Sequence, residues 1–391
     1  HNAFTGALIG HAGASAPDVA AMYDHALVTG GPALRAMTFH DRARMLKALA
    51  QYLSARKNEL YELSYLTGAT KSDSWIDIDG GIGTTFVFAS KGRREMPDAH
   101  VYLDGDVEML SRHGSFVGQH VCTPLQGVAV HINAFNFPVW GMLEKLAPTL
   151  LAGMPAIVKP ATVTGYLTEA AFRMIIESGL LPDGAVQLVS GRLGPLLDML
   201  GPQDAVSFTG SAVTGVMLRG TPNLLERSVR FSAEQDSLNA TILGPDVMVG
   251  DPEFDLFIKE TAGEITAKAG QKCTAVRRIL VPEALRQPVA EALRAALDDV
   301  AIGDPRLKEV GMGALASGGQ KQDVLAKCEM FKGEARCIIG GEAPRLTGED
   351  LAGGAFVAPT IFDCADPDGA THLHEQEDFG PVACLMPYRD L

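Results

Sequence analysis

The sequence predicts an α/β fold in which a doubly wound parallel sheet is followed by a second α/β domain. With 391 residues the chain is longer than one compact core usually allows, so two or more domains are expected. Its hydrophobic content of 47% and charged content of 20% are typical of a soluble globular protein, and its 42 glycines suit tight turns. A short apolar strand followed by a helix recurs between residues 127 and 219, a pattern typical of a parallel sheet.

Helices are predicted before this pattern begins. A short helix is expected over 17–28. Thr38 and Asp41 resemble a capping box at the start of a long amphipathic helix, which Gly68 ends. A further helix is predicted over 75–90 despite its internal glycines.

The segment 101–123 is polar, alternating and interrupted by glycines. This indicates two strands in an exposed hairpin or edge ribbon. Because an exposed strand edge needs cover, the ribbon 102–123 is a candidate oligomerisation element.

Strand–helix units then follow one another along the chain. The predicted pairs are 127–132 with 140–151, 156–158 with 164–178, 186–189 with 193–200 and 205–208 with 213–219. Ligands of such sheets bind beyond the carboxyl ends of the strands, so the turns at these ends are the places to look for a site. After a strand at 229–231, a second α/β region is predicted from helices at 254–269, 283–299 and 319–332 and strands at 278–281 and 336–340.

Charge and cysteine content exclude several classes of protein. A net charge of −14 argues against nucleic acid as a partner, because phosphate binding needs clustered Lys and Arg. The six cysteines are scattered without a CxxC pair, so no metal site and no disulfide framework are expected, and a cytoplasmic location is the default. No apolar run reaches the ~18 residues of a transmembrane helix, so no membrane partner is expected.

The two ends of the chain suggest a fragment of a longer protein. The start has neither a Met nor a basic leader, and the end follows an apolar, strand-like run without a terminating element. We therefore expect part of the C-terminal domain to be missing.

Cys273 lies in the segment Ala269–Ala275, which is predicted to be a turn between an amphipathic helix and an apolar strand. A thiol in a polar turn is a candidate nucleophile, because the thiolate needs partial exposure and polar neighbours. A cysteine alone is more often a small buried hydrophobe, so the assignment needs support from other motifs.

Three other turns carry candidate groups, each with a plainer alternative. Asn136, in the turn 133–138, can offer its amide to a developing oxyanion or can be an ordinary turn residue. Lys159 ends a strand and can reach a nucleotide, or can be a solvated loop lysine. Glu234 can be a general base for water near a thiol, or a solvated loop residue.

The turn 208–215 is rich in Gly and Ser and enters a helix, so its N–H groups could hold a pyrophosphate. It is not the GxGxxG fingerprint, and the alternative is an ordinary strand–helix turn. The absence of GxxxxGK[ST] disfavours NTP hydrolysis.

A thiol nucleophile, an oxyanion donor, a carboxylate base and a dinucleotide site together resemble the aldehyde dehydrogenase superfamily over nearly the whole chain. The resemblance implies the aldehyde dehydrogenase fold, with a Rossmann-like cofactor domain, a catalytic domain and a β-ribbon. It implies that Cys273 is the nucleophile, Glu234 the general base, Asn136 the oxyanion donor and Lys145 a residue near the proton exit path. The implied cofactor-binding residues are Phe135, Lys159, Thr162, Gly210, Ser211, Gly215, Glu377 and Phe379.

The resemblance also implies a domain organisation. Residues 1–101 and 124–236 would form a discontinuous NADP-binding domain, and 237–391 a truncated catalytic domain. The ribbon 102–123 would serve oligomerisation, so a homodimer or a higher homo-oligomer is expected.

Three departures from the common family pattern narrow the prediction. The segment 235–239 differs from the usual Leu-Gly-Gly-Lys, and Glu234 precedes Cys273 by 39 residues, a longer distance than in common members. Both features resemble the branch that oxidises CoA-thioester semialdehydes from phenylacetate or benzoate breakdown. Thr162 stands where NAD-preferring members often carry Glu, so NADP is the expected cofactor, with NAD as a weaker one.

Two alternatives stay open. A CoA-acylating aldehyde dehydrogenase would transfer the acyl group to CoA, but such enzymes usually lack the base that Glu234 supplies. A catalytically silent cofactor-binding or structural member would lack turnover. The complete set of candidate residues favours an active enzyme.

Overall fold

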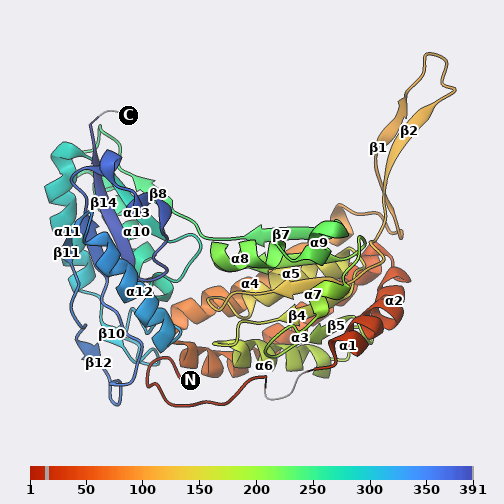
Figure 1. The fold of residues 1–391 in the computed structure, drawn as a ribbon, viewed down its shortest axis with the longest axis horizontal. Helices are drawn as coiled ribbons and strands as arrows, with labels where there is room; N and C mark the ends of the chain where they lie inside the picture. The colour runs from red at the N-terminus through yellow and green to blue at the C-terminus, as the bar shows by residue number, and fades with distance from the viewer. Residues whose placement is uncertain (14–16, 390–391) are drawn as a thin grey trace. The chain divides into compact units, whose positions relative to one another are not determined.

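The computed structural model describes residues 1–13 and 17–389 (Figure 1). The chain divides into two compact units, which are described separately. The N-terminal unit comprises residues 11–60 and 76–235, and the C-terminal unit comprises residues 1–10, 61–75 and 236–391.

The N-terminal unit is built on a five-stranded, fully parallel sheet with the strand order β5-β4-β3-β6-β7. Its strands are β3 (Ala129–Ile132), β4 (Ala156–Lys159), β5 (Val186–Leu188), β6 (Ala205–Thr209) and β7 (Arg230–Glu234). Along the chain, β4 and β5 are added on one side of β3, and β6 and β7 are then added on its other side. This change of side is the topological switch of a doubly wound sheet. The predicted fold class is therefore confirmed for this part of the chain.

Helices connect these strands. They are α5 (Trp140–Leu151), α6 (Gly165–Glu177), α7 (Leu196–Met199), α8 (Ala212–Arg219) and α9 (Pro222–Glu226). In α5, Met142, Leu143, Leu146 and Leu150 are buried, the spacing of an apolar face packed on a sheet. The helix predicted over 193–200 is shorter than expected, because Pro195 stands at its N-cap.

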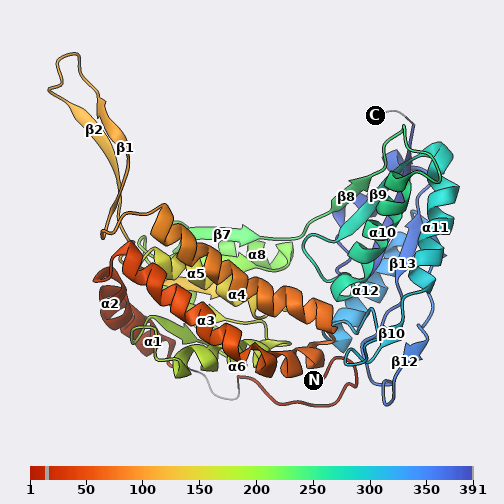
Figure 2. The ribbon, with the colours of Figure 1, turned by 180° about the vertical axis from the view of Figure 1, so that it is seen from behind.

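The N-terminal helices are α1 (Val19–His25), α2 (Gly31–Arg35), α3 (Phe39–Ser64) and α4 (Lys71–Arg94), with a short π-helix, Ala26–Gly30, between the first two. The capping box at the start of α3 is confirmed, because the Thr38 N–H donates to Asp41 and the Asp41 N–H donates to the Thr38 hydroxyl. Helices α3 and α4 lie side by side, and the ion pair Lys57–Asp79 links them (Figure 2).

The predicted hairpin is also present. Strands β1 (Tyr102–Met109) and β2 (Val117–Cys122) pair antiparallel and project away from the sheet of their unit (Figures 1 and 2). Most of their side chains are exposed.

The C-terminal unit contains a mixed five-stranded sheet with the order β11-β13-β14-β9-β8. Its strands are β8 (Asn239–Ile242), β9 (Val276–Pro282), β11 (Arg336–Ile339), β13 (Thr360–Asp363) and β14 (Val382–Tyr388); only β11 runs antiparallel to its neighbour. A small parallel pair joins β10 (Ile302–Gly303) to β12 (Leu346–Thr347).

Helices cover both faces of this sheet. Ala383 and Leu385 of β14 pack in one cluster with α10 (Pro252–Thr266) and α11 (Arg286–Asp298). The alternate residues Cys384 and Met386 pack in another cluster with α12 (Gly318–Phe331) and the short α13 (His372–Glu375). This alternation is the period of two that a strand buried on both faces requires.

Candidate active site

The loop that carries Cys273 follows α10 and has an unusual backbone. Lys268, Ala269 and Gly270 all have positive φ, at 56°, 51° and 70°. This left-handed conformation costs about 1–2 kcal/mol for each residue with a side chain. A Cβ on Gly270 would lie 2.0 Å from the Gly380 carbonyl oxygen, so only glycine fits there. The loop therefore depends on surrounding contacts to keep its shape.

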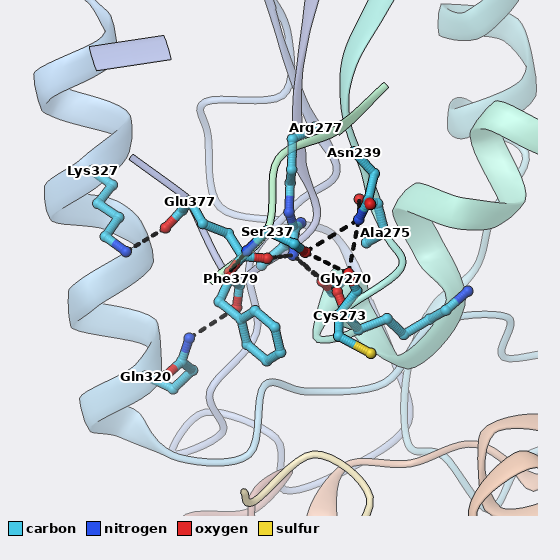
Figure 3. Close-up of polar contacts among 12 residues, drawn as sticks. Ser237, Asn239, Gly270, Cys273, Ala275, Arg277, Gln320, Lys327, Glu377 and Phe379 are labelled. Atoms are coloured by element: carbon cyan, nitrogen blue, oxygen red, sulfur yellow. Dashed lines mark hydrogen bonds and ion pairs between the residues drawn. The ribbon is translucent and has the colours of Figure 1, made fainter. Parts of the chain in front are cut away.

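The backbone of Cys273 is held by two side-chain donors (Figure 3). The Ser237 hydroxyl donates to the Cys273 carbonyl at 2.5 Å, and the Asn239 amide donates to the same oxygen at 2.7 Å. The Cys273 side chain itself is partly exposed, and its sulfur points away from these two donors (Figure 3). A thiol placed in this way meets the exposure that a nucleophile needs.

Lys272, next to the cysteine, turns to α10. Its ammonium group lies 2.8 Å from both carboxylate oxygens of Glu264. The contact anchors the loop to the helix that precedes it.

Arg277 connects the loop of Cys273 to the segment that carries Glu377 and Phe379. Its guanidinium donates to the carbonyl oxygens of Gly270 at 2.8 Å and Gly380 at 2.7 Å, and to the Glu377 carboxylate at 3.3 Å. The side chains of Arg277 and Glu377 are only 4% and 6% exposed. Burial raises the pKa of Glu377, and the neighbouring guanidinium opposes that shift. Removing either partner would leave an uncompensated buried charge.

The segment around Glu377 and Phe379 is held by its backbone. Lys327 donates to the Glu377 carbonyl, and Gln320 donates to the Phe379 carbonyl at 2.8 Å (Figure 3). The Arg277 guanidinium lies 5.6 Å from the centre of the Phe379 ring. Asp378 is buried between these residues, which raises the pKa of its carboxyl to about 7.

In the N-terminal unit, Asn136 is 7% exposed and lies in the turn between β3 and α5. Two threonines hold this turn through its carbonyl groups: Thr164 donates to Phe135 at 2.9 Å and Thr168 to Pro138 at 3.0 Å. Together they fix the backbone on both sides of Asn136.

Asp77 holds the same turn through its N–H groups. This carboxylate is fully buried and accepts bonds from the N–H groups of Val139 at 3.1 Å and Trp140 at 2.8 Å, where α5 begins. A carboxylate at this end of a helix satisfies donors that have no partner within the helix and also complements the helix dipole.

Replacing Asp77 with alanine should therefore lower the free energy of unfolding by about 1–3 kcal/mol, because buried N–H groups at the start of α5 lose their acceptor. Chemical denaturation would measure this. Asp77→Asn keeps an acceptor oxygen and should cost less. Asp183→Ala, which removes an exposed partner of His25, should cost no more than about 0.5 kcal/mol. Equal losses in Asp77→Ala and Asp183→Ala would contradict the capping role.

Lys145 and Glu234 line one pocket of about 580 Å³ in this unit. The Lys145 ammonium group donates to the Thr209 hydroxyl at 2.8 Å, and the Glu144 carboxylate lies 3.3 Å away. Thr209 is paired with Glu234 across strands β6 and β7. His131, in the same pocket, has a pKa lowered to about 3 by burial and by the charge of Lys145. The pocket thus contains a carboxylate with a hydroxyl and an ammonium group near it.

Five of the candidate cofactor residues, Lys159, Thr162, Gly210, Ser211 and Gly215, follow the carboxyl ends of β4 and β6 or end β4 itself. Lys159 is the last residue of β4, and burial lowers the pKa of its amine. Thr162 is exposed in the turn that follows. Ser211 caps α8 by accepting the Thr214 N–H at 3.3 Å.

Two glycines, at the turn between β6 and α8 and in the first turns of α8, pack closely against neighbouring groups. The Gly210 N–H donates to the Glu234 carbonyl at 3.1 Å, and a Cβ on Gly215 would meet the Gln235 side chain at 1.9 Å. A lysine, a helix N-terminus and two close-packed glycines at a topological switch are a set that fits a dinucleotide cofactor.

The structure thus groups the predicted residues by unit. Cys273, Glu377 and Phe379 belong to one network of the C-terminal unit, and the other candidates belong to the N-terminal unit. Sequence reasoning missed the roles of Ser237, Asn239 and Arg277. The departure of segment 235–239 from the family pattern was the one signal that could have directed attention to the first two.

Two kinds of feature are absent from the described residues. No group of three or more His, Cys, Asp or Glu side chains among them is arranged to hold a metal ion. None of the described helices combines the length and apolarity needed to cross a membrane.

Comparison with known proteins gives the family. The model of the "Aldehyde dehydrogenase family" matches residues 1–391. A 3,4-dehydroadipyl-CoA semialdehyde dehydrogenase from Aromatoleum evansii is 43% identical over 375 residues, which are 95% of this chain and 73% of that protein.

Solved structures agree with this match. A putative aldehyde dehydrogenase from Burkholderia cenocepacia has a TM-score of 0.84 and 25% identity, covering 100% of this chain and 76% of that one. Betaine aldehyde dehydrogenase from Staphylococcus aureus, in complex with NAD+, has a TM-score of 0.80 at 24% identity and covers 93% of this chain and 70% of that one, which supports the fold. The chain therefore belongs to the aldehyde dehydrogenase family and is an NAD(P)-dependent oxidoreductase that acts on aldehydes.

Proposed function

We propose that this protein oxidises a CoA-thioester semialdehyde from aromatic catabolism to the free carboxylic acid, with NADP as the cofactor. The observation that carries the substrate class is the 43% identity to a protein named as a CoA-semialdehyde dehydrogenase. The partly exposed Cys273 thiol, on a loop held by Ser237, Asn239 and Arg277, supports covalent catalysis.

In the proposed reaction, the Cys273 thiolate attacks the aldehyde carbon and forms a C–S bond. The Asn136 amide and the Cys273 N–H donate to the oxygen, which gains negative charge. The bound cofactor would supply the acceptor for the hydride that leaves this carbon. Cys273 is then held as a thioester of the substrate's acyl group.

Glu234 acts as the base in the second half of the reaction. It takes a proton from water as the water oxygen attacks the thioester carbon. The C–S bond breaks, and the acid and the Cys273 thiolate result. Lys145 and Thr209, which line the same pocket as Glu234, offer groups through which that proton can leave.

The proposed cofactor contacts rest on the resemblance to the family. Lys159 would bind a ribose of the cofactor, Gly210, Ser211 and Gly215 would line the phosphate turn, and Glu377 would bind the nicotinamide ribose. Phe135 and Phe379 complete the set of proposed cofactor-binding residues. The N-terminal unit would thus serve as the cofactor domain and the C-terminal unit as the catalytic domain.

One assay tests this function. The protein is incubated with NADP and a panel of simple aldehydes and CoA-linked semialdehydes, and NADPH is followed at 340 nm. We expect NADPH formation with the CoA-linked semialdehydes and a free acid as the product. A CoA thioester newly formed at the oxidised carbon, or a preference for small unlinked aldehydes, would contradict the proposal.

Thr162 is the residue on which the proposed NADP preference depends. Changing it to glutamate should raise the KM for NADP at least roughly tenfold and leave the KM for NAD within about threefold, because a carboxylate there repels a 2′-phosphate. Steady-state kinetics with both cofactors would measure this. Thr162→Gln is the control of equal size without charge. If both variants raise the KM for NADP equally, charge is not the cause.

We also propose a homodimer or a higher homo-oligomer. The β1–β2 hairpin exposes Leu103, Met109, Phe116 and Val121, each at least 53% accessible. Apolar side chains at a projecting edge are typical of an interface. Light scattering coupled to gel filtration would give the mass, and a monomer at micromolar concentration would contradict this part of the proposal.

A further inference from the structure

Ser237 makes two hydrogen bonds with distant parts of the chain. Its backbone N–H donates to Oε2 of Glu377 at 3.1 Å, and its hydroxyl donates to the carbonyl oxygen of Cys273 at 2.5 Å (Figure 3). One residue thus contacts both the proposed nucleophile and the residue proposed to hold the nicotinamide ribose. The first bond uses the backbone and the second uses the side chain, so a substitution can remove one without the other.

The Glu377 carboxylate is fixed at both oxygens. Arg277 donates to Oε1 at 3.3 Å, while Ser237 donates to Oε2. Both donors also bind the loop of Cys273: Ser237 donates to the Cys273 carbonyl, and Arg277 donates to the Gly270 carbonyl. Two separate connections therefore join Glu377 to the thiol loop.

Asn239 supports the same carbonyl. Its amide donates to the Cys273 oxygen at 2.7 Å and to the Ser237 hydroxyl oxygen at 3.2 Å. A carbonyl oxygen has two lone pairs and can accept from both residues at once. The Ser237 hydroxyl is oriented by this amide, which donates to it, and it donates in turn to the loop.

The loop needs such contacts. Lys268 and Ala269 hold left-handed backbone conformations that residues with side chains disfavour, so the loop would relax if its contacts were lost. The sulfur of Cys273 points away from Ser237 and Asn239, so these residues hold the backbone of Cys273 and do not cover its sulfur (Figure 3).

We propose that Ser237 is a positioning residue of the dehydrogenase, whose hydroxyl fixes the backbone of the nucleophile while its N–H fixes Glu377. This inference rests on the proposed roles of Cys273 and Glu377. It assigns a purpose to the position where the chain departs from the common family pattern.

Ser237→Ala tests the inference because it removes the hydroxyl and keeps the N–H. We expect kcat to fall about fivefold to tenfold and the KM for the cofactor to stay within about twofold. Ser237→Thr keeps both donors and should recover at least half of the wild-type kcat. Ser178→Ala is the matched control, because it removes a serine hydroxyl bonded to a backbone carbonyl, that of Ile175, far from these residues in the chain. It should leave kcat unchanged.

A second measurement works without a substrate. Alkylation of Cys273 by iodoacetamide, followed by peptide mass spectrometry, should be at least about threefold slower in Ser237→Ala than in the wild type. Ser237→Thr and Ser178→Ala should react at the wild-type rate. If Ser237→Ala does not fold, Asn239→Ala removes the other donor to the same carbonyl and should slow alkylation in the same way.

Three outcomes would overturn the inference: wild-type kcat in folded Ser237→Ala, a rise in the cofactor KM as large as the fall in kcat, or unchanged alkylation of Cys273. These differ from failure of the proposed function, which would show as NADPH formation by Cys273→Ala or as the wrong product. If the substrate belongs to another class, the alkylation experiment still tests the role of Ser237, because it needs no substrate.

Discussion

Cys273→Ala should abolish aldehyde oxidation, with kcat reduced by at least about 10⁴-fold. The methyl group cannot form the C–S bond, so the aldehyde carbon never becomes the tetrahedral alkoxide from which hydride leaves. NADPH formation with a CoA-linked semialdehyde would measure the loss. Cofactor binding, followed by protein fluorescence, should stay within about threefold of the wild type, because alanine keeps the backbone contacts of Ser237 and Asn239.

Cys337→Ala is the matched control for this experiment. Cys337 lies on β11, and burial raises the pKa of its thiol, so it is a poor nucleophile. The control should keep kcat within about twofold. Substantial turnover by Cys273→Ala would refute the assigned nucleophile, and inactivity of the wild type with every aldehyde tested would favour a catalytically silent protein.

Glu234→Gln should separate the two halves of the reaction. Hydride transfer does not need the Glu234 base, so a stopped-flow trace should show one burst of NADPH per active site. Hydrolysis needs a base for water, so the steady rate after the burst should fall by about 10²- to 10⁴-fold. The amide has nearly the same shape as the carboxylate but cannot take a proton.

Glu226→Gln, an exposed residue at the end of α9, is the control and should show the wild-type burst and steady rate. Mass spectrometry of the stalled variant should find the acyl group on Cys273. A wild-type steady rate in Glu234→Gln would show that another group activates the water. If added CoA restored turnover of this variant and appeared in the product, a CoA-acylating reaction would replace the proposed hydrolysis.

Local signals in the sequence determined most of the secondary structure and the fold class. The bounds predicted for α5, residues 140–151, are those of the structure, because an apolar face at helical spacing follows a turn with Pro138. The capping pair Thr38 and Asp41 was readable because its two members are three residues apart. The order of the candidate motifs along the chain pointed to the family for the same reason: each motif is short and contiguous.

Tertiary structure alone decided which distant residues support these motifs. Ser237 and Glu377 are separated by 140 residues, and Asp77 lies 63 residues before the N–H of Trp140 that it accepts from. The short strands β8 and β13 were missed because they become strands only through neighbours elsewhere in the sheet. Helical and strand periodicity is a property of neighbouring residues and can be read from the sequence. The partner of a buried hydrogen bond depends on how the whole chain packs. The residues that hold the backbone around Cys273 and Asn136 could therefore be identified only in the folded structure.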